Sequence, residues 1–234
     1  MRFSLIYPFY ENQGMLELQL YEWQSHKSCD LIIIDDGSPN NPASDVLEPE
    51  KGLHLYRVKQ DFPWHQHGCR NLGALVCETP FALFSDMDHM LRADDAIKLE
   101  KEQCPKDKMY MFQRVTAPTM NGYKPHPNSF LCSIDKYWES GGYDEDYCDP
   151  NSGVPMYGGD GVFIRRLTER TDSVMRHDIS LVRYPREYVE DASTVQYERN
   201  GTYKENYRRE FDRKRYEGDE EPKNPIRFQW ERVI

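Results

Sequence analysis

Residues 31–38 read Leu-Ile-Ile-Ile-Asp-Asp-Gly-Ser, an apolar run that stops at two acids and a glycine. A short continuous run rich in isoleucine is typical of a strand buried on both faces, and Asp-Gly-Ser is typical of a turn that ends one. Such runs alternate with segments of helical spacing, which predicts βαβ units and an α/β fold with a mixed, mostly parallel central sheet flanked by helices. The expected strands are residues 3–7, 31–34, 53–58, 81–84 and 109–115, and the expected helices are residues 12–25, 69–77 and 94–102.

Length and composition narrow the class of protein. The chain has 234 residues, 38% of them hydrophobic, and a formal net charge of −10. This is enough chain for one α/β domain, and its acidic balance argues against nonspecific coating of polyanions. The chain contains no apolar stretch of about 20 residues and no secretory signal, so we expect a cytoplasmic protein. Six scattered cysteines without a CxxC pair indicate reduced thiols rather than a zinc site or a disulfide framework.

Acidic residues follow two of the expected strands and recur later in the chain. Asp35 and Asp36 follow the second strand, Asp86 and Asp88 follow the fourth, and Asp160 lies in Tyr-Gly-Gly-Asp-Gly. Ligands of open α/β sheets bind beyond the carboxyl ends of the strands. Two carboxylates two residues apart can face one cation, and oxygen ligands suit Mg²⁺ or Mn²⁺ that also holds phosphates. The pattern therefore indicates a metal-diphosphate site, whereas a solvated acidic turn is the simpler alternative.

A basic residue lies between these acids in the chain. Arg70 occurs in Gly-Cys-Arg-Asn-Leu-Gly, one short helix before the Asp86 strand. A guanidinium at this edge of the sheet is suited to clamping a phosphate. The alternative is that Arg70 caps a helix or pairs with a nearby acid.

Five short motifs follow one another in a recognisable order. They are Asp-Asp-Gly-Ser at 35–38, Gly-Cys-Arg-Asn-Leu-Gly at 68–73, Phe-Ser-Asp-Met-Asp-His at 84–89, Gly-Gly-Tyr-Asp-Glu-Asp at 141–146 and Tyr-Gly-Gly-Asp-Gly at 157–161. This order resembles the family 2 nucleotide-sugar glycosyltransferases with the GT-A fold, over about residues 3–167. The resemblance implies one GT-A-like, Rossmann-like domain over 1–195, with a nucleotide-sugar-binding half at 1–115 and an acceptor half at 116–195. Residues 196–234 are expected to form a helical extension packed on that domain, because aromatic residues recur every four positions there.

The resemblance also implies roles for individual residues. An inverting transfer needs a metal and an arginine to neutralise the departing diphosphate and one carboxylate to activate the acceptor hydroxyl. The implied roles are Pro8 and Asp36 beside the base, Arg70 on the nucleotide or its diphosphate, Asp86 on the ribose or donor sugar and the metal, Asp88 on the Mn²⁺ or Mg²⁺, and Asp160 as the general base.

Other positions are less specific. His177 is the expected third metal ligand, with His126 and His89 as alternatives. Trp64 is expected to stack on the base or to cover the edge of the core. Tyr143 and Asp144 are expected on the acceptor side. Many relatives carry Glu-Asp where this chain has Asp160 followed by glycine, so the alignment of the base is open and inversion is favoured rather than established.

Other functions stay open at this point. In a haloacid-dehalogenase-like phosphatase Asp86 would be the nucleophile and Asp88 the acid, although that pair normally follows the first strand. A nucleotidyltransferase needs a basic glycine-rich loop after the first strand, which residues 7–12 do not supply. A non-catalytic nucleotide-sugar or carbohydrate-binding module would not need Asp160. For a transferase, the donor is a nucleoside diphosphate sugar, and the acceptor is a glycan, a lipid-linked glycan, a protein, a small molecule or a modified DNA base.

Overall fold

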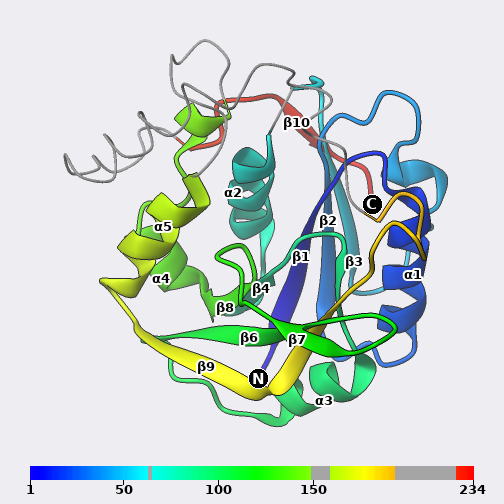
Figure 1. The fold of residues 1–234 in the computed structure, drawn as a ribbon. Helices are drawn as coiled ribbons and strands as arrows, with labels where there is room; N and C mark the ends of the chain where they lie inside the picture. Colours follow the sequence, from blue (N-terminus) through cyan, green and yellow to red (C-terminus); the bar gives the residue numbers. More distant parts are fainter. Residues whose placement is uncertain (63–64, 149–158, 193–224) are drawn as a thin grey trace, which may run out of the picture.

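The computed structural model describes residues 1–62, 65–148, 159–192 and 225–234, and its core is one large sheet (Figure 1). The strands are β1 (Phe3–Phe9), β2 (Asp30–Asp35), β3 (Leu53–Val58), β4 (Phe81–Phe84), β5 (His89–Leu91), β6 (Lys108–Thr116), β7 (Asn121–Tyr123), β8 (Phe130–Ser133), β9 (Asp172–Arg183) and β10 (Trp230–Arg232). The helices are α1 (Gln13–Gln24), α2 (Gln66–Val76), α3 (Ala93–Lys101), α4 (Ile134–Glu139) and α5 (Gly159–Thr168), with 3₁₀ turns η1 (Ala43–Asp45) and η2 (Glu145–Tyr147).

The sheet is mixed. Its strand order is β10-β3-β2-β1-β4-β8-β6-β9-β5, and β7 pairs with β6. The central strands β3, β2, β1 and β4 are all parallel, whereas β8 is antiparallel to both β4 and β6. In Figure 1 strands β6 and β9 cross the lower part of the molecule at a steep angle to β1 and β2. The expected α/β fold with a mixed central sheet flanked by helices is confirmed.

Side chains alternate between two hydrophobic layers because successive residues of a strand point to opposite faces. Along β1, Leu5 and Tyr7 belong to one layer and Ile6 belongs to the other. The layer of Leu5 includes residues of α1 and α3, and the layer of Ile6 includes residues of α2, α4 and α5. The two groups of helices therefore cover opposite faces of the sheet.

Two glycines permit close approaches that shape the carboxyl edge of the sheet. A Cβ on Gly73 would lie 2.4 Å from Ile6 Cγ2, so glycine lets α2 lie directly against β1. Gly37 has φ +74° and a Cβ there would lie 2.7 Å from the Gln60 carbonyl oxygen, so the turn after β2 requires glycine. Both α2 and this turn consequently have fixed positions at the end of the parallel strands.

The end of the chain differs from the expected helical extension. Within residues 225–234 no residue is helical, and β10 (Trp230–Arg232) pairs antiparallel with β3. The aromatic spacing from Tyr203 to Phe211, which carried that expectation, lies outside the described residues. The helices of the described segments are all too short or too polar to cross a bilayer.

Candidate active site

The turn from β4 to β5 carries two aspartates at the carboxyl edge of the parallel strands. Buried groups beneath it fix its backbone: Tyr7 donates its hydroxyl to the His89 carbonyl at 2.9 Å, and Gln19 Nε2 donates to the Met87 carbonyl at 2.9 Å. The His89 N–H closes the turn on the Asp86 carbonyl at 3.0 Å. Asp86 and Asp88 are thereby held at one point of the edge, as the sequence predicts for strand ends.

Asp86 is held by α2. Its Oδ1 accepts hydrogen bonds from Arg70 Nη2 and from Gln66 Nε2, each at 2.7 Å. The Arg70 side chain is fully buried, whereas 20% of the Asp86 side chain is exposed. Burial opposes ionisation of Asp86, but the positive charge of Arg70 and the hydrogen bond that it donates outweigh burial and keep the pKa of Asp86 below its usual range. Asp86 is therefore an ionised carboxylate at neutral pH.

Asp88 forms the other half of the site together with His89. His89 Nδ1 lies 2.6 Å from Asp88 Oδ1, and its Nε2 lies 3.1 Å from Arg114 Nη1 and beside the Tyr123 hydroxyl. Because arginine only donates, Nε2 acts as the acceptor and the proton is on Nδ1, which donates to Asp88. Arg183 Nε approaches Asp88 Oδ2 at 3.5 Å. Asp88 therefore faces a neutral imidazole on one side and a guanidinium on the other.

His126 and Asp160 complete the surroundings. His126 Nδ1 accepts from the Asn128 N–H at 3.2 Å and lies 3.6 Å from Asp86 Oδ2. Asp160 lies in the first turn of α5. Burial lowers the pKa of His126, and the carboxylates of Asp86 and Asp160 both act on it in the opposite direction. His126 therefore interacts electrostatically with both acids.

Asp86, Asp88 and His89 are here called the acidic cluster, and its two carboxylates suit a divalent cation. One ligand atom from each lies within 4.8 Å of the other two. Each aspartate holds close contacts of 2.6–2.7 Å through Oδ1 and only longer contacts of 3.5–3.6 Å through Oδ2. The two Oδ2 atoms are therefore the oxygens best placed to turn toward a cation, and carboxylate oxygens suit Mg²⁺ or Mn²⁺.

Three predicted site residues are buried and hold contacts within the protein. Arg70 is fully buried and donates through Nη2 to Asp86 Oδ1 at 2.7 Å, and its expected contact with a nucleotide or diphosphate stays a prediction. Tyr143 is fully buried, stacked on Phe163 at 4.3 Å, and donates its hydroxyl to Asn128 Oδ1 at 3.2 Å. Asp144 is buried and caps η2 by accepting from the Asp146 N–H at 3.0 Å. Arg70 thus contacts Asp86 directly, whereas Tyr143 packs against α5 and Asp144 fixes η2.

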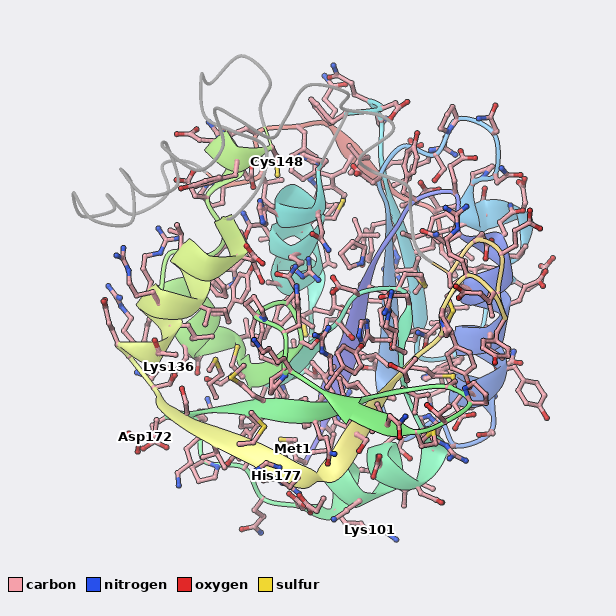
Figure 2. All side chains as sticks on the ribbon, viewed as in Figure 1. Met1, Lys101, Lys136, Cys148, Asp172 and His177 are labelled. Atoms are coloured by element: carbon pink, nitrogen blue, oxygen red, sulfur yellow. The ribbon has the colours of Figure 1, made fainter. Side chains whose placement is uncertain are left out.

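The predicted third metal ligand is not in the acidic cluster. His177 is exposed on β9, in the segment where the register of β9 against β6 shifts. Figure 2 shows it at the bottom of the molecule, on the opposite side from Cys148. The structure places His89 beside the two aspartates instead. Trp64 lies outside the described residues.

Pro8 and Asp36 lie where the sequence places them, at the ends of two adjacent parallel strands. Pro8 pairs with Ile34 near the end of β1, and Asp36 directly follows β2. Pro8 is half-buried and Asp36 is buried, with His65 Nδ1 lying 3.2 Å from its Oδ1. In the strand order these two residues lie on the β3 side of the acidic cluster, at the ends of β1 and β2.

Sequence reasoning did not identify four residues that contact the acidic cluster: Gln66, Arg114, Tyr123 and Arg183. Arg114 and Tyr123 face each other across the β6–β7 pair, with the guanidinium carbon 4.2 Å from the ring centroid. Arg183 reaches Asp88 because β9 pairs with β5. These contacts join strands that are far apart in the chain, and no local motif marks them.

Comparison with known proteins shows a structural likeness without a sequence family. No family model matches the chain, and no curated protein matches it. The crystal structure of S. aureus TarS superposes with a TM-score of 0.62 at 13% identity, covering 79% of this chain and 37% of that one. A structure of S. aureus TarS 1-349 gives a TM-score of 0.61 at 13% identity, covering 94% of this chain and 73% of that one. The chain therefore shares the fold of TarS and spans about a third of the longer TarS chain.

Proposed function

We propose that the protein is a metal-dependent glycosyltransferase that transfers a sugar from a nucleoside diphosphate sugar to an acceptor hydroxyl. The observation that carries the proposal is the acidic cluster at the carboxyl edge of the parallel strands, where His126 lies near Asp86 and interacts electrostatically with Asp160. The fold supports it, because TarS is a glycosyltransferase with a GT-A-like fold. The five sequence motifs between residues 35 and 161 also occur in the order that resembles the family 2 glycosyltransferases.

In this proposal the acidic cluster binds the metal and the diphosphate of the donor. Asp86 and Asp88 would hold Mn²⁺ or Mg²⁺ through their Oδ2 atoms, and a bound divalent cation neutralises the charge that develops on a departing diphosphate. Arg70 and Gln66 keep the Asp86 carboxylate ionised and oriented. Arg183 and Arg114 add positive charge on the Asp88 side, where an arriving diphosphate needs it.

In this proposal Asp160 is the general base that activates the acceptor hydroxyl. In an inverting transfer one carboxylate removes the proton of the acceptor hydroxyl as its oxygen attacks the anomeric carbon, while the bond from that carbon to the diphosphate oxygen breaks. Asp160 is partly exposed in the first turn of α5. His126 lies in the electrostatic field of both Asp160 and Asp86, so it would mark the boundary between the donor and the acceptor.

The base of the nucleotide is assigned to the edge near Pro8 and Asp36. Pro8 lies near the end of β1, and Asp36 directly follows the neighbouring parallel strand β2. Strand β1 also pairs with β4, the strand that precedes Asp86. The acceptor, whether glycan, lipid-linked glycan, protein, small molecule or modified DNA base, would enter from the side of α5. Tyr143 and Asp144 shape this side from beneath.

A melting panel tests the proposal. Nucleoside diphosphates and their sugars are added to the folded protein with Mn²⁺, with Mg²⁺ or with a chelator, because a ligand specific for the native state raises the melting temperature. We expect one nucleotide to raise it only when a divalent cation is present. Failure of every nucleotide in protein shown to be folded would overturn the proposal. Hydrolysis of simple phosphate esters without nucleotide binding would instead favour the phosphatase.

A further inference from the structure

A second group of metal-ligating side chains lies apart from the acidic cluster, between the end of β2 and the start of α2. It consists of Asp36, His65 and Cys69, here called the thiol cluster, and all three are buried. His65 Nδ1 lies 3.2 Å from Asp36 Oδ1 and 3.9 Å from Cys69 Sγ. One ligand atom from each residue lies within 4.8 Å of the other two.

The local structure fixes each of these side chains. His65 is the residue before α2 and Cys69 lies four positions later, so both side chains lie on one face of the helix. The Cys69 N–H donates to the His65 carbonyl at 3.0 Å, and the Asp36 N–H donates to the Phe9 carbonyl at 2.9 Å. The three ligand atoms therefore converge without any change of backbone conformation.

Aromatic rings hold the imidazole in place. Phe62 stacks on the His65 ring with centroids 4.5 Å apart, and Phe228 meets it edge-on at 4.1 Å. Phe228 belongs to the C-terminal segment, which pairs with β3 through β10. The ring cannot turn away from Asp36 and Cys69 without disturbing both contacts. The two rings therefore restrict rotation of the imidazole.

We propose that Asp36, His65 and Cys69 bind a zinc ion. Zinc bonds to oxygen, nitrogen and sulfur measure about 2.0–2.3 Å, which puts the ligand atoms of a tetrahedral centre about 3.3–3.8 Å apart. The separations of 3.2 and 3.9 Å lie about 0.1 Å outside the two ends of this range, so small side-chain adjustments would bring the ligand atoms to it. A thiolate and an imidazole select zinc over magnesium or manganese, which distinguishes this site from the acidic cluster.

Charge balance supports the same assignment. One carboxylate, one thiolate and one neutral imidazole together carry two negative charges, which a divalent cation cancels inside the core. Binding forms the metal–sulfur bond and releases the Cys69 proton to solvent. Water would fill the fourth position, as in zinc sites with three protein ligands.

The bound ion would join three parts of the chain. It would tie the turn after β2 to the start of α2 and, through the His65 ring, to Phe228 of the C-terminal segment. This region is the wall of the edge at which Pro8 and Asp36 lie. The inference rests on these residues alone and does not require that the protein be a transferase.

Cobalt(II) titration of metal-free protein provides the test, because Co²⁺ replaces Zn²⁺ and reports on its ligands by absorption. We expect one equivalent of Co²⁺ to give tetrahedral visible bands and a sulfur-to-cobalt charge-transfer band in the near ultraviolet, both removed by added Zn²⁺. Cys69→Ser should abolish the sulfur band. Cys29→Ser, the matched change at a buried thiol in the other hydrophobic layer, should leave it unchanged.

Two further variants keep the test decisive. Asp36→Asn preserves the thiol and the side-chain shape, and we expect at least about tenfold weaker Co²⁺ binding. Asp88→Asn in the acidic cluster should not alter the sulfur band. Absence of the band in the native protein, its survival in folded Cys69→Ser, or unchanged affinity in folded Asp36→Asn would overturn the proposal. None of these results depends on nucleotide binding, so a failure here is separable from a failure of the transferase proposal.

Discussion

The acidic cluster and the thiol cluster both combine aspartate with histidine at the same edge of the sheet, but their surroundings differ. The aspartates of the acidic cluster are 14% and 20% exposed, with arginines around them. The thiol cluster is buried and bordered by aromatic rings. Exposed carboxylates near guanidinium groups suit a cation that arrives with a phosphorylated ligand, whereas a buried thiol and imidazole suit a resident ion. The surroundings, more than the ligand types, thus distinguish the cation proposed for the acidic cluster from the ion proposed for the thiol cluster.

The largest effect is expected at Asp160, which only the chemistry of the acidic cluster requires. Asp160→Asn should lower the rate of transfer by about 10³-fold, because removing a general base costs on the order of 10²–10⁴-fold. Release of nucleoside diphosphate in the presence of acceptor measures this rate. Donor affinity in the melting panel should be unchanged. Transfer at the native rate would show that another group removes the proton.

Asp88→Asn probes the difference between the two clusters directly. The substitution removes a ligand charge from the acidic cluster, so nucleotide binding that depends on Mn²⁺ should weaken by about 100-fold or more. Calorimetric titration with the donor, with and without Mn²⁺, measures the loss. Cobalt binding at the thiol cluster in the same variant is the control. Equal losses at both clusters would show that they are not independent.

The sequence predicts the strands and helices that carry the site better than it predicts the contacts between the side chains. The parallel strands and the helices α1, α2 and α3 follow from apolar runs and helical spacing, and the acids fall at strand ends as expected. The pattern does not indicate that Arg70 is buried, because a motif records residue order and not depth. Strand β9 is also missed, since many of its residues are polar and partly exposed at an edge region of the sheet. The sequence pattern therefore does not predict the contact between Arg183 and Asp88.

The burial of Arg70 gives a test of how the acidic cluster is held. Arg70 and Arg183 each contact one of its aspartates, but Arg70 is fully buried and the Arg183 side chain is 42% exposed. Arg70→Met should lower the free energy of unfolding by about 3 kcal/mol, because breaking a buried pair leaves its partner uncompensated. Arg183→Met should change it by less than about 1 kcal/mol, as for exposed ion pairs. Chemical denaturation compares the two, and equal effects would contradict the difference in burial.

The smallest of these effects concerns the C-terminal segment, whose Phe228 contacts His65 of the thiol cluster. Glu145 is buried, and its carboxylate accepts from the N–H groups of Ile226 at 2.6 Å and Arg227 at 3.0 Å and from Asn71 Nδ2 at 2.8 Å. Glu145→Gln removes the charge and turns an amide N–H toward these donors, so the free energy of unfolding should fall by about 2 kcal/mol.

Asp146→Asn is the matched control for Glu145→Gln, because the Asp146 side chain also pairs with Arg227 but is 41% exposed. It should cost less than about 1 kcal/mol by chemical denaturation. Hydrogen exchange of the β10 amides should rise in Glu145→Gln and stay unchanged in Asp146→Asn. Because Phe228 follows the two anchored N–H groups and supports His65, the Glu145 variant should also weaken cobalt binding at the thiol cluster. Unaltered cobalt binding with faster exchange would show that the imidazole keeps its position without the C-terminal segment.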